Sequence, residues 1–144
     1  YVALYGAAAT SELYKCVVAG AAASDLAASV SDAKREYGAD SEAYEYWLKS
    51  IGDPKGDNAK LASLSPIRLV DRIKAPVLLI HGSEDTIENV NQSRRMNKAL
   101  KEAGRDVEYL ELKYEGHNDW RLETEIQVLE KIDAFLSVHL KADE

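Results

Sequence analysis

Three stretches of this sequence are apolar enough to form buried strands. Residues 14–19 read YKCVVA, residues 77–80 read VLLI and residues 107–112 read VEYLEL. A nearly continuous apolar run is typical of a strand covered on both faces, whereas alternating apolar and polar residues are typical of a strand with one exposed face. We therefore expect the strand at 77–80 to be central and buried, and the strand at 107–112 to lie nearer an edge of the sheet.

The segments around these strands carry the residue spacing of helices. Predicted helices cover residues 1–9, one or two segments of 32–51 interrupted near Gly38, and residues 58–64, 91–103 and 123–140. Gly104 stands at the position of a helix C-cap, and Pro66 follows the end of the helix at 58–64. Strands that alternate with helices predict an α/β fold with a parallel sheet.

Polar segments follow the second and third predicted strands. Asp85 lies five residues after Ile80, and His117 lies five residues after Leu112. In a parallel sheet the carboxyl ends of neighbouring strands share one edge and lie about 4.8 Å apart, so these two loops can bring the carboxylate against the imidazole. A carboxylate on the Nδ1 side of an imidazole orients the ring and stabilises the imidazolium that forms when Nε2 takes a proton from a nucleophile. The pair therefore matches the acid and the base of a catalytic triad.

The neighbouring residues have structural interpretations. His81 ends a buried strand, where a histidine with structural hydrogen bonds is expected. Gly82 and Gly116 are expected to let the backbone turn sharply beside the two catalytic side chains. Taken singly, His117 also fits a solvated loop histidine, and Asp85 fits a helix cap or a solvated charge. The joint pattern of an acid after one strand and a histidine after the next favours catalysis.

Composition and charge narrow the possible functions. The chain has 144 residues, of which 46% are hydrophobic and 30% are charged, as is typical of about one globular domain. A net charge of -7 and a sequence pI near 5.0 argue against nucleic acid as a partner. No apolar stretch approaches the roughly 20 residues of a membrane-spanning helix, so no membrane span is expected.

Metal and cofactor chemistry finds no support in the sequence. The three histidines show no His-Glu-x-x-His spacing, and a single cysteine cannot form a Cys-x-x-Cys site. We expect neither a metal site nor a cofactor. Cys16 lies in an apolar run and is expected to be a buried structural thiol.

A resemblance to a known family is carried by motifs along the chain. They are SPI at 65–67, VDRIKAPVLLIHG at 70–82, Asp85, Gln92-Ser93, Met96, Gly116-His117 and the helix start at 123–124. With these motifs the sequence resembles the carboxyl-terminal part of the prolyl oligopeptidase family of serine peptidases, which includes the dipeptidyl peptidases and the acylaminoacyl peptidases. The resemblance covers nearly the whole chain.

The resemblance implies a fold, an activity and two catalytic residues. Residues 1–144 would be the C-terminal portion of a catalytic domain with a partial α/β-hydrolase fold, made of the C-terminal strands of a mainly parallel sheet with flanking helices. Asp85 matches the triad aspartate of the family's His-Gly-x-x-Asp motif, and His117 matches the triad histidine. The implied activity is hydrolysis of short peptides through an acyl-enzyme, without a cofactor.

The triad serine of the family has no counterpart in this sequence. Because α/β-hydrolases order their triad as serine, acid and histidine, the resemblance implies a Gly-x-Ser-x-Gly elbow a few residues before Tyr1. We therefore expect the chain to supply Asp85 and His117 but not the nucleophile, and to be inactive by itself. The first strand would expose an edge that invites pairing. We expect either a complementary N-terminal portion that carries the nucleophile or self-association by swapping of elements.

Two departures from the family pattern bear on specificity. Glu88-Asn89 stands where the family commonly has Val-Pro shortly after the aspartate, which leaves the shape of this loop open. Residues 24–30 contain none of the aromatic side chains that close a pocket around proline in the proline-selective members, so a proline preference is not implied. Two alternatives stay open: an esterase of the same fold, and a catalytically inert hydrolase-derived fragment with a binding or structural role.

Overall fold

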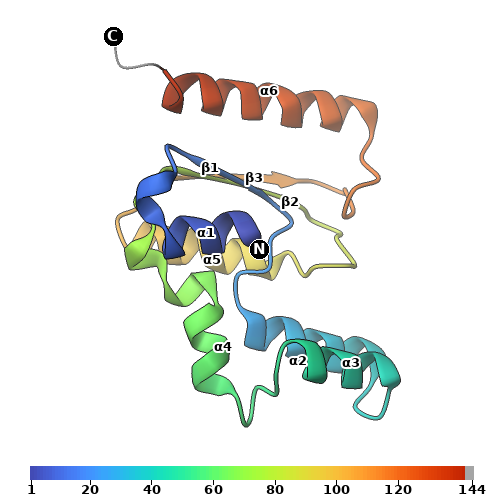
Figure 1. Ribbon diagram of the computed structural model, residues 1–144. Coiled ribbons are helices and arrows are strands. Elements are labelled where there is room, and N and C mark those ends of the chain that lie inside the picture. The colour runs from blue at the N-terminus through green and yellow to red at the C-terminus, as the bar shows by residue number, and fades with distance from the viewer. Residues whose placement is uncertain (142–144) are drawn as a thin grey trace.

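The computed structural model describes residues 1–141 and contains a three-stranded parallel sheet (Figure 1). The strands are β1 (Val17–Gly20), β2 (Val77–Gly82) and β3 (Val107–Leu112), in the spatial order β1-β2-β3. Both strand pairs are parallel, and all of β2 is buried. The predicted α/β fold with a central second strand is therefore confirmed.

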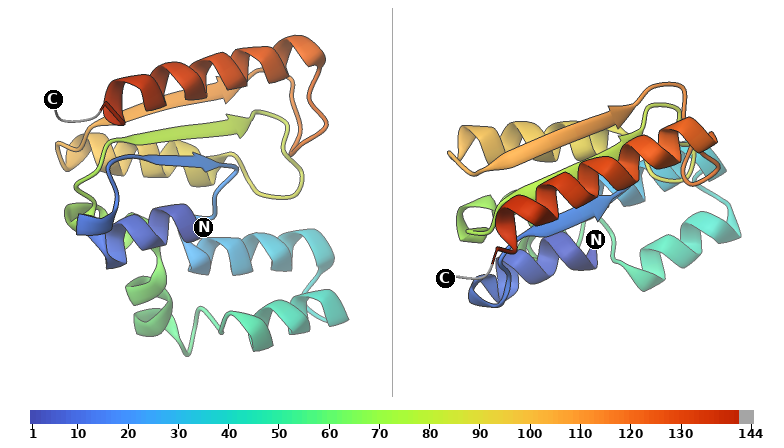
Figure 2. Two further views of the ribbon diagram at one scale, coloured as in Figure 1. Left: turned by 45° about the horizontal axis from the view of Figure 1, so that its top comes forward. Right: turned by 90° about the horizontal axis from the view of Figure 1, so that it is seen from above.

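Helices surround this sheet in three layers. Within residues 1–141 they are α1 (Val2–Ala9), α2 (Leu26–Tyr37), α3 (Glu42–Ser50), α4 (Asn58–Leu64), α5 (Asn91–Glu102) and α6 (Leu122–His139), with short 3-10 helices η1 (Ser11–Leu13), η2 (Pro66–Arg68) and η3 (Val70–Arg72). α1 and α5 cover one face of the sheet and α6 covers the other, while α2, α3 and α4 lie beyond α1 and α5 (Figures 1 and 2). The helices predicted at 58–64, 91–103 and 123–140 are confirmed to within a residue at each end.

Two apolar cores lie on the two faces of β2. Because successive side chains of a strand point to opposite faces, Val77 and Leu79 pack toward α1 and α5, whereas Leu78 and Ile80 pack toward α6. All four are at most 2% exposed. Full burial of such a side chain contributes about 1.5–3 kcal/mol, so these two cores hold the carboxyl end of β2 in place.

Two element boundaries differ from the predicted ones. β1 begins at Val17, not at residue 14, because its first ladder bond runs from the Val17 N–H to the Pro76 carbonyl at 2.9 Å, level with the start of β2. α2 begins at Leu26, where the helical segment was predicted from residue 32. The Asp25 side chain caps this helix by accepting the Ala28 N–H at 3.2 Å.

The end of α5 follows the prediction closely. Gly104 has φ +66, a left-handed conformation that favours glycine. Its N–H bonds the Lys101 carbonyl at 3.0 Å, and the Arg105 N–H bonds the Leu100 carbonyl at 2.9 Å. This pair of bonds is a Schellman motif, which turns the chain from α5 into β3.

Three further observations concern the chain as a whole. Cys16 is half-buried against the core under α6, so the expected burial of its thiol is only partial. No helix of residues 1–141 combines the length and the apolar character that crossing a membrane requires. In the same residues no group of three or more histidine, cysteine, aspartate or glutamate side chains is arranged to hold a metal ion.

Candidate active site

Asp85 lies in the loop that follows β2, at the carboxyl edge of the sheet. Its side chain is 0% exposed. Oδ1 accepts the backbone N–H groups of Ile87 and Glu88, both at 2.8 Å. The loop thus folds around the carboxylate, leaving Oδ2 for partners from other parts of the site.

His117 lies in the loop that follows β3, beside Asp85. Its Nδ1 is 2.8 Å from Asp85 Oδ2, and its side chain is 34% exposed. Because the ionised carboxylate can only accept, Nδ1 carries the proton of this hydrogen bond. Within residues 1–141 no hydrogen bond engages Nε2 of this ring. The structure therefore brings the two predicted site residues together and leaves the basic nitrogen available.

The environment of Asp85 favours its ionised form. Burial raises the pKa of Asp85, but the hydrogen bonds from the Glu88 backbone, the His117 ring and the Ile87 backbone together outweigh it. The resulting pKa lies below the ordinary value for aspartate. The ionised carboxylate of Asp85 can accept a hydrogen bond from His117 and stabilise an imidazolium there.

The two loops are fastened to each other directly beyond the strands. The Ser83 N–H bonds the Leu112 carbonyl at 2.9 Å, and the Tyr114 N–H bonds Ser83 Oγ at 2.8 Å. The Glu84 N–H bonds the Glu115 carbonyl at 2.9 Å. These bonds extend the pairing of β2 and β3 and set the distance between Asp85 and His117.

The two glycines beside the site differ in role from the expectation. A Cβ on Gly82 would collide with the carbonyl groups of Gly116 and Glu115, so glycine is required there for close approach of the backbones. A Cβ on Gly116 would meet nothing within 4 Å. Neither glycine has a positive φ. At Gly82 the requirement for glycine is thus space between two loops, whereas Gly116 shows neither a positive φ nor a close approach.

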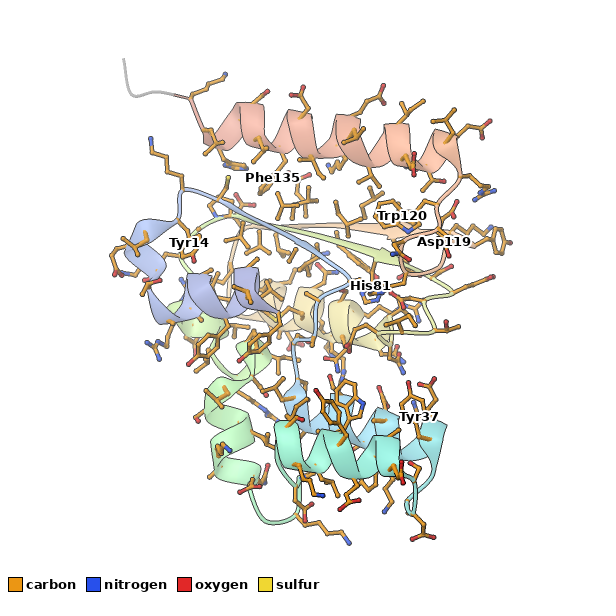
Figure 3. The ribbon with its side chains drawn as sticks, turned by 45° about the vertical axis from the view of Figure 1, so that its right-hand side comes forward. Tyr14, Tyr37, His81, Asp119, Trp120 and Phe135 are labelled. Carbon is orange, nitrogen blue, oxygen red and sulfur yellow. The ribbon has the colours of Figure 1, made fainter. Side chains whose placement is uncertain are left out.

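Glu115 anchors the loop that carries His117. It is 3% exposed, and its Oε1 accepts Arg121 Nε and Thr124 Oγ1, each at 2.6 Å. The bonds from Thr124 and Arg121 lower the pKa of Glu115. Trp120, labelled in Figure 3 near this loop, donates its Nε1–H to the Gly116 carbonyl at 3.1 Å. The loop is therefore closed at both ends around His117.

His81 supports Asp85 from the buried side. It is 0% exposed and lies between β2 and α5 (Figure 3). Its Nε2 is 2.9 Å from the Glu88 carbonyl and 3.2 Å from Asp85 Oδ2. Both oxygens can only accept, so Nε2 carries the proton, and Nδ1 accepts Ser93 Oγ–H at 2.7 Å. The predicted structural histidine is confirmed, and its Nε2 lies within 3.2 Å of the candidate catalytic acid.

Sequence reasoning missed the supporting partners of the site. Ser93 and Glu115 were not predicted to contact it, although Ser93 lies 12 residues from His81 in the sequence. Glu88 was noted only as a departure from a family pattern, yet its backbone binds both Asp85 and His81. The one signal in the sequence is that Ser93 is a polar residue at helical spacing from Met96 and Leu100, on the face of α5 that is buried.

The sequence matches one family of known proteins over almost its whole length. A sequence model of the prolyl oligopeptidase family matches residues 1–143. Among curated protein sequences, none matches this chain.

Solved structures with the same arrangement of helices and strands are peptidases. The acylaminoacyl peptidase of Pyrococcus horikoshii is 25% identical with a TM-score of 0.80, and the match covers 97% of this chain and 22% of that one. The puromycin-hydrolyzing peptidase of Mycobacterium tuberculosis is 26% identical with a TM-score of 0.79. The match covers 96% of this chain and 20% of that one. Dipeptidyl peptidase 4 of Porphyromonas gingivalis shares the fold, with 18% identity and a TM-score of 0.69. This match covers 88% of this chain and 16% of that one.

These comparisons give the fold and the family of the chain. The chain spans about a fifth of the length of the solved structures that it matches. The similar structures have the α/β-hydrolase fold that the sequence motifs implied. Because the family match runs from residue 1 to residue 143, the chain belongs to the prolyl oligopeptidase family of serine peptidases.

Proposed function

We propose that this chain supplies the acid and the base of a serine peptidase, with His117 as general base and general acid and Asp85 as the carboxylate that orients it. The observation that carries the proposal is the 2.8 Å contact between His117 Nδ1 and Asp85 Oδ2 at the carboxyl edge of the sheet. Membership of a serine peptidase family and the similarity to two peptidases at 25–26% identity support peptides as substrates.

The proposed reaction proceeds through an acyl-enzyme. His117 Nε2 takes the proton of the serine hydroxyl while the serine oxygen attacks the peptide carbonyl. The imidazolium then gives this proton to the leaving amine as the carbon–nitrogen bond breaks. In the second half, His117 takes a proton from water as the water oxygen attacks the ester, and gives it to the serine oxygen as the carbon–oxygen bond breaks and the acid product leaves. Asp85 stays ionised throughout and stabilises each imidazolium.

We propose that the serine comes from outside these 144 residues, with the chain as the C-terminal portion of an α/β-hydrolase catalytic domain. Figure 2 shows the N-terminus near the carboxyl end of β1 and the start of α2. The backbone nitrogen of Tyr1 lies near the Glu88 carboxyl. A segment joined to Tyr1 would therefore run beside the loop that holds Asp85.

The test uses the peptidase assembled from this chain and the portion that carries the serine. A fluorophosphonate probe is expected to label a serine in that portion, and aminoacyl amides are expected to be hydrolysed. Asp85→Asn is expected to lower kcat for amide hydrolysis by roughly a thousand-fold or more, because the imidazole loses its orienting carboxylate. Asp119→Asn is the matched control, since Asp119 is an exposed aspartate two residues from His117.

Each other outcome has a definite meaning. Hydrolysis of esters without amides would make the assembled protein an esterase of the same fold. Full activity of His117→Ala would exclude this histidine as the base. Absence of labelling and of hydrolysis with both portions present would favour a binding or structural role.

A further inference from the structure

A cavity of about 350 Å³ lies beside the candidate catalytic acid. One wall is the segment from Asp85 to Asn89, and the opposite wall belongs to α2 and α3, with Ser29 and Trp47 among its residues. We call this space the acidic cavity. Asp85 lines this cavity and is bonded to His117, so the cavity adjoins the pair at which the proposed reaction takes place.

Glu88 is the carboxylate in the loop wall of the acidic cavity. Its side chain is half-buried and accepts a hydrogen bond from Ser29 Oγ at 3.3 Å. Its backbone is fixed on both sides, by the N–H that binds Asp85 Oδ1 and by the carbonyl that accepts His81 Nε2. The loop that positions the catalytic acid therefore also positions the Glu88 carboxylate.

The electrostatics around Glu88 favour a cation. Burial raises the pKa of Glu88, and the charges of Asp32 and Asp85 raise it further, against the hydrogen bond of Ser29. Such a carboxylate gains from a positive charge placed in the cavity, which would offset both its burial and the repulsion of its neighbours.

The remaining walls lack a free counter-ion for Glu88. Among the described residues that line the cavity, Arg35 is the only lysine or arginine, and its Nη2 is bound to Asp32 at 2.7 Å with the side chain 70% exposed. The rings of Tyr37, labelled in Figure 3 at the end of α2, and of Trp47 also line the space. A carboxylate facing aromatic rings in a concave site is the composition that binds organic cations, because aromatic faces attract positive charge.

We propose that the acidic cavity binds the positively charged side chain of the substrate residue that forms the acyl-enzyme, with Glu88 as its counter-ion. The ligand class is a peptide with an arginine or lysine on the acyl side of the cleaved bond. This inference rests on the proposed peptidase function. It makes Glu88 a specificity-determining residue, while Asp85 and His117 carry out the chemistry.

The experiment compares two substrates that differ in charge and hardly in shape. N-blocked amides of arginine and of citrulline, in which an uncharged urea replaces the guanidinium, are given to the assembled peptidase. Arginine is expected to be preferred in kcat/KM by roughly 10- to 100-fold, the range of a charge-assisted hydrogen bond. Glu88→Gln keeps an acceptor for Ser29 and is expected to remove most of this preference by lowering kcat/KM for the arginine amide.

Glu84→Gln is the matched control. Glu84 is an exposed glutamate of the same loop and does not line the cavity, so the arginine preference is expected to persist in this variant. Equal rates for arginine and citrulline in the unsubstituted peptidase would overturn the proposal while leaving the peptidase function intact. A Glu88-dependent preference for substrates with a free α-amino group, whatever their side chain, would overturn the side-chain assignment and give the cavity to the α-ammonium.

A binding measurement separates this inference from the proposed function if no substrate is hydrolysed. The chain contains two tryptophans, of which Trp47 lines the cavity and Trp120 does not. With isotope-labelled tryptophan, the guanidinium compound agmatine is expected to shift the indole N–H signal of Trp47 and not that of Trp120. The shift is expected to be lost in Glu88→Gln. An unmoved Trp47 signal would overturn the proposal.

Discussion

Both oxygens of the Asp85 carboxylate are held by the protein before a substrate arrives. Backbone N–H groups hold Oδ1 at 2.8 Å, and the rings of His117 and His81 hold Oδ2 at 2.8 and 3.2 Å. A carboxylate fixed in this way does not reorganise when His117 becomes charged, which is the condition for low-cost stabilisation of an imidazolium. The pair is thus preorganised for the proposed chemistry before a substrate binds.

The lowered pKa of Asp85 predicts how stability depends on pH. A carboxyl whose pKa is lower in the folded state than in the unfolded state stabilises the fold above its unfolded pKa of about 3.9, and this stabilisation is lost as the pH falls through the folded pKa. The difference in unfolding free energy between the unsubstituted chain and Asp85→Asn is therefore expected to be constant near neutral pH and to shrink below about pH 4. Urea unfolding of both proteins at a series of pH values measures this difference. A difference in unfolding free energy that stays constant into the acid range would contradict the prediction.

At the scale of elements, a buried glutamine joins α2 to α5. Gln92 is 0% exposed, and its Oε1 accepts the N–H groups of Ser24 and Asp25 at 3.1 and 2.9 Å. Its Nε2 donates to the Asp25 carbonyl and to Ser29 Oγ. These bonds fix the start of α2 against α5, and α2 in turn forms a wall of the acidic cavity.

Replacement of this glutamine is expected to be costly. Gln92→Met preserves length but leaves several buried donors and acceptors without partners, each worth about 1–3 kcal/mol. We expect a loss of about 3 kcal/mol or more in the free energy of unfolding, measured with urea. Gln127→Met on the exposed face of α6 is the matched control, expected to change stability by less than about 0.5 kcal/mol. Equal stability of the two variants would show that the hydrogen bonds of Gln92 do not stabilise the fold.

Elements with a local signal in the sequence could be predicted, whereas contacts between distant segments could not. The apolar period of α5, its glycine cap and the run at Val77–Gly82 are local signals, and they located these elements correctly. The start of α2 at Leu26 lacked such a signal, because small residues there carry no apolar period and the cap bond of Asp25 is seen only once folded. The acidic cavity joins Ser29, Trp47 and Glu88 from three segments, and no local pattern connects them.

At the scale of the whole molecule, the two outer strands of the described sheet differ in charge. β3 carries Glu108 and Glu111, which pair with Lys131 and Arg94, and charged side chains discourage a sheet edge from pairing further. β1 reads VVAG and carries no charge. Within residues 1–141 its outer edge has no strand partner. The outer edge of β1 is thus the expected place of contact with a complementary portion or with a second copy.

This edge can be blocked by a substitution that leaves the backbone bonds from β1 to β2 in place. The N–H groups of Val17 and Ala21 bond Pro76 and Ile80 on β2, so by alternation the N–H of Val18 points to the outer edge. Val18→Pro removes that outward donor. By sedimentation, the unsubstituted chain alone is expected to form larger species and Val18→Pro to shift toward monomer, with Val18→Ala as control. A well-folded monomeric unsubstituted chain would contradict this expectation.

The acid and the base both belong to the unit of β2, α5 and β3, with their loops bonded to each other beyond the strands. Asp85 and His117 are therefore positioned by one unit of the fold, whose two loops are bonded to each other. If this unit shifts against the rest of a complete peptidase, the gap that opens lies between His117 and the serine, while the distance between His117 and Asp85 stays at 2.8 Å. An enzyme of this design can be switched off by separating its two halves and regain activity on their return, since the charge pair never has to be rebuilt.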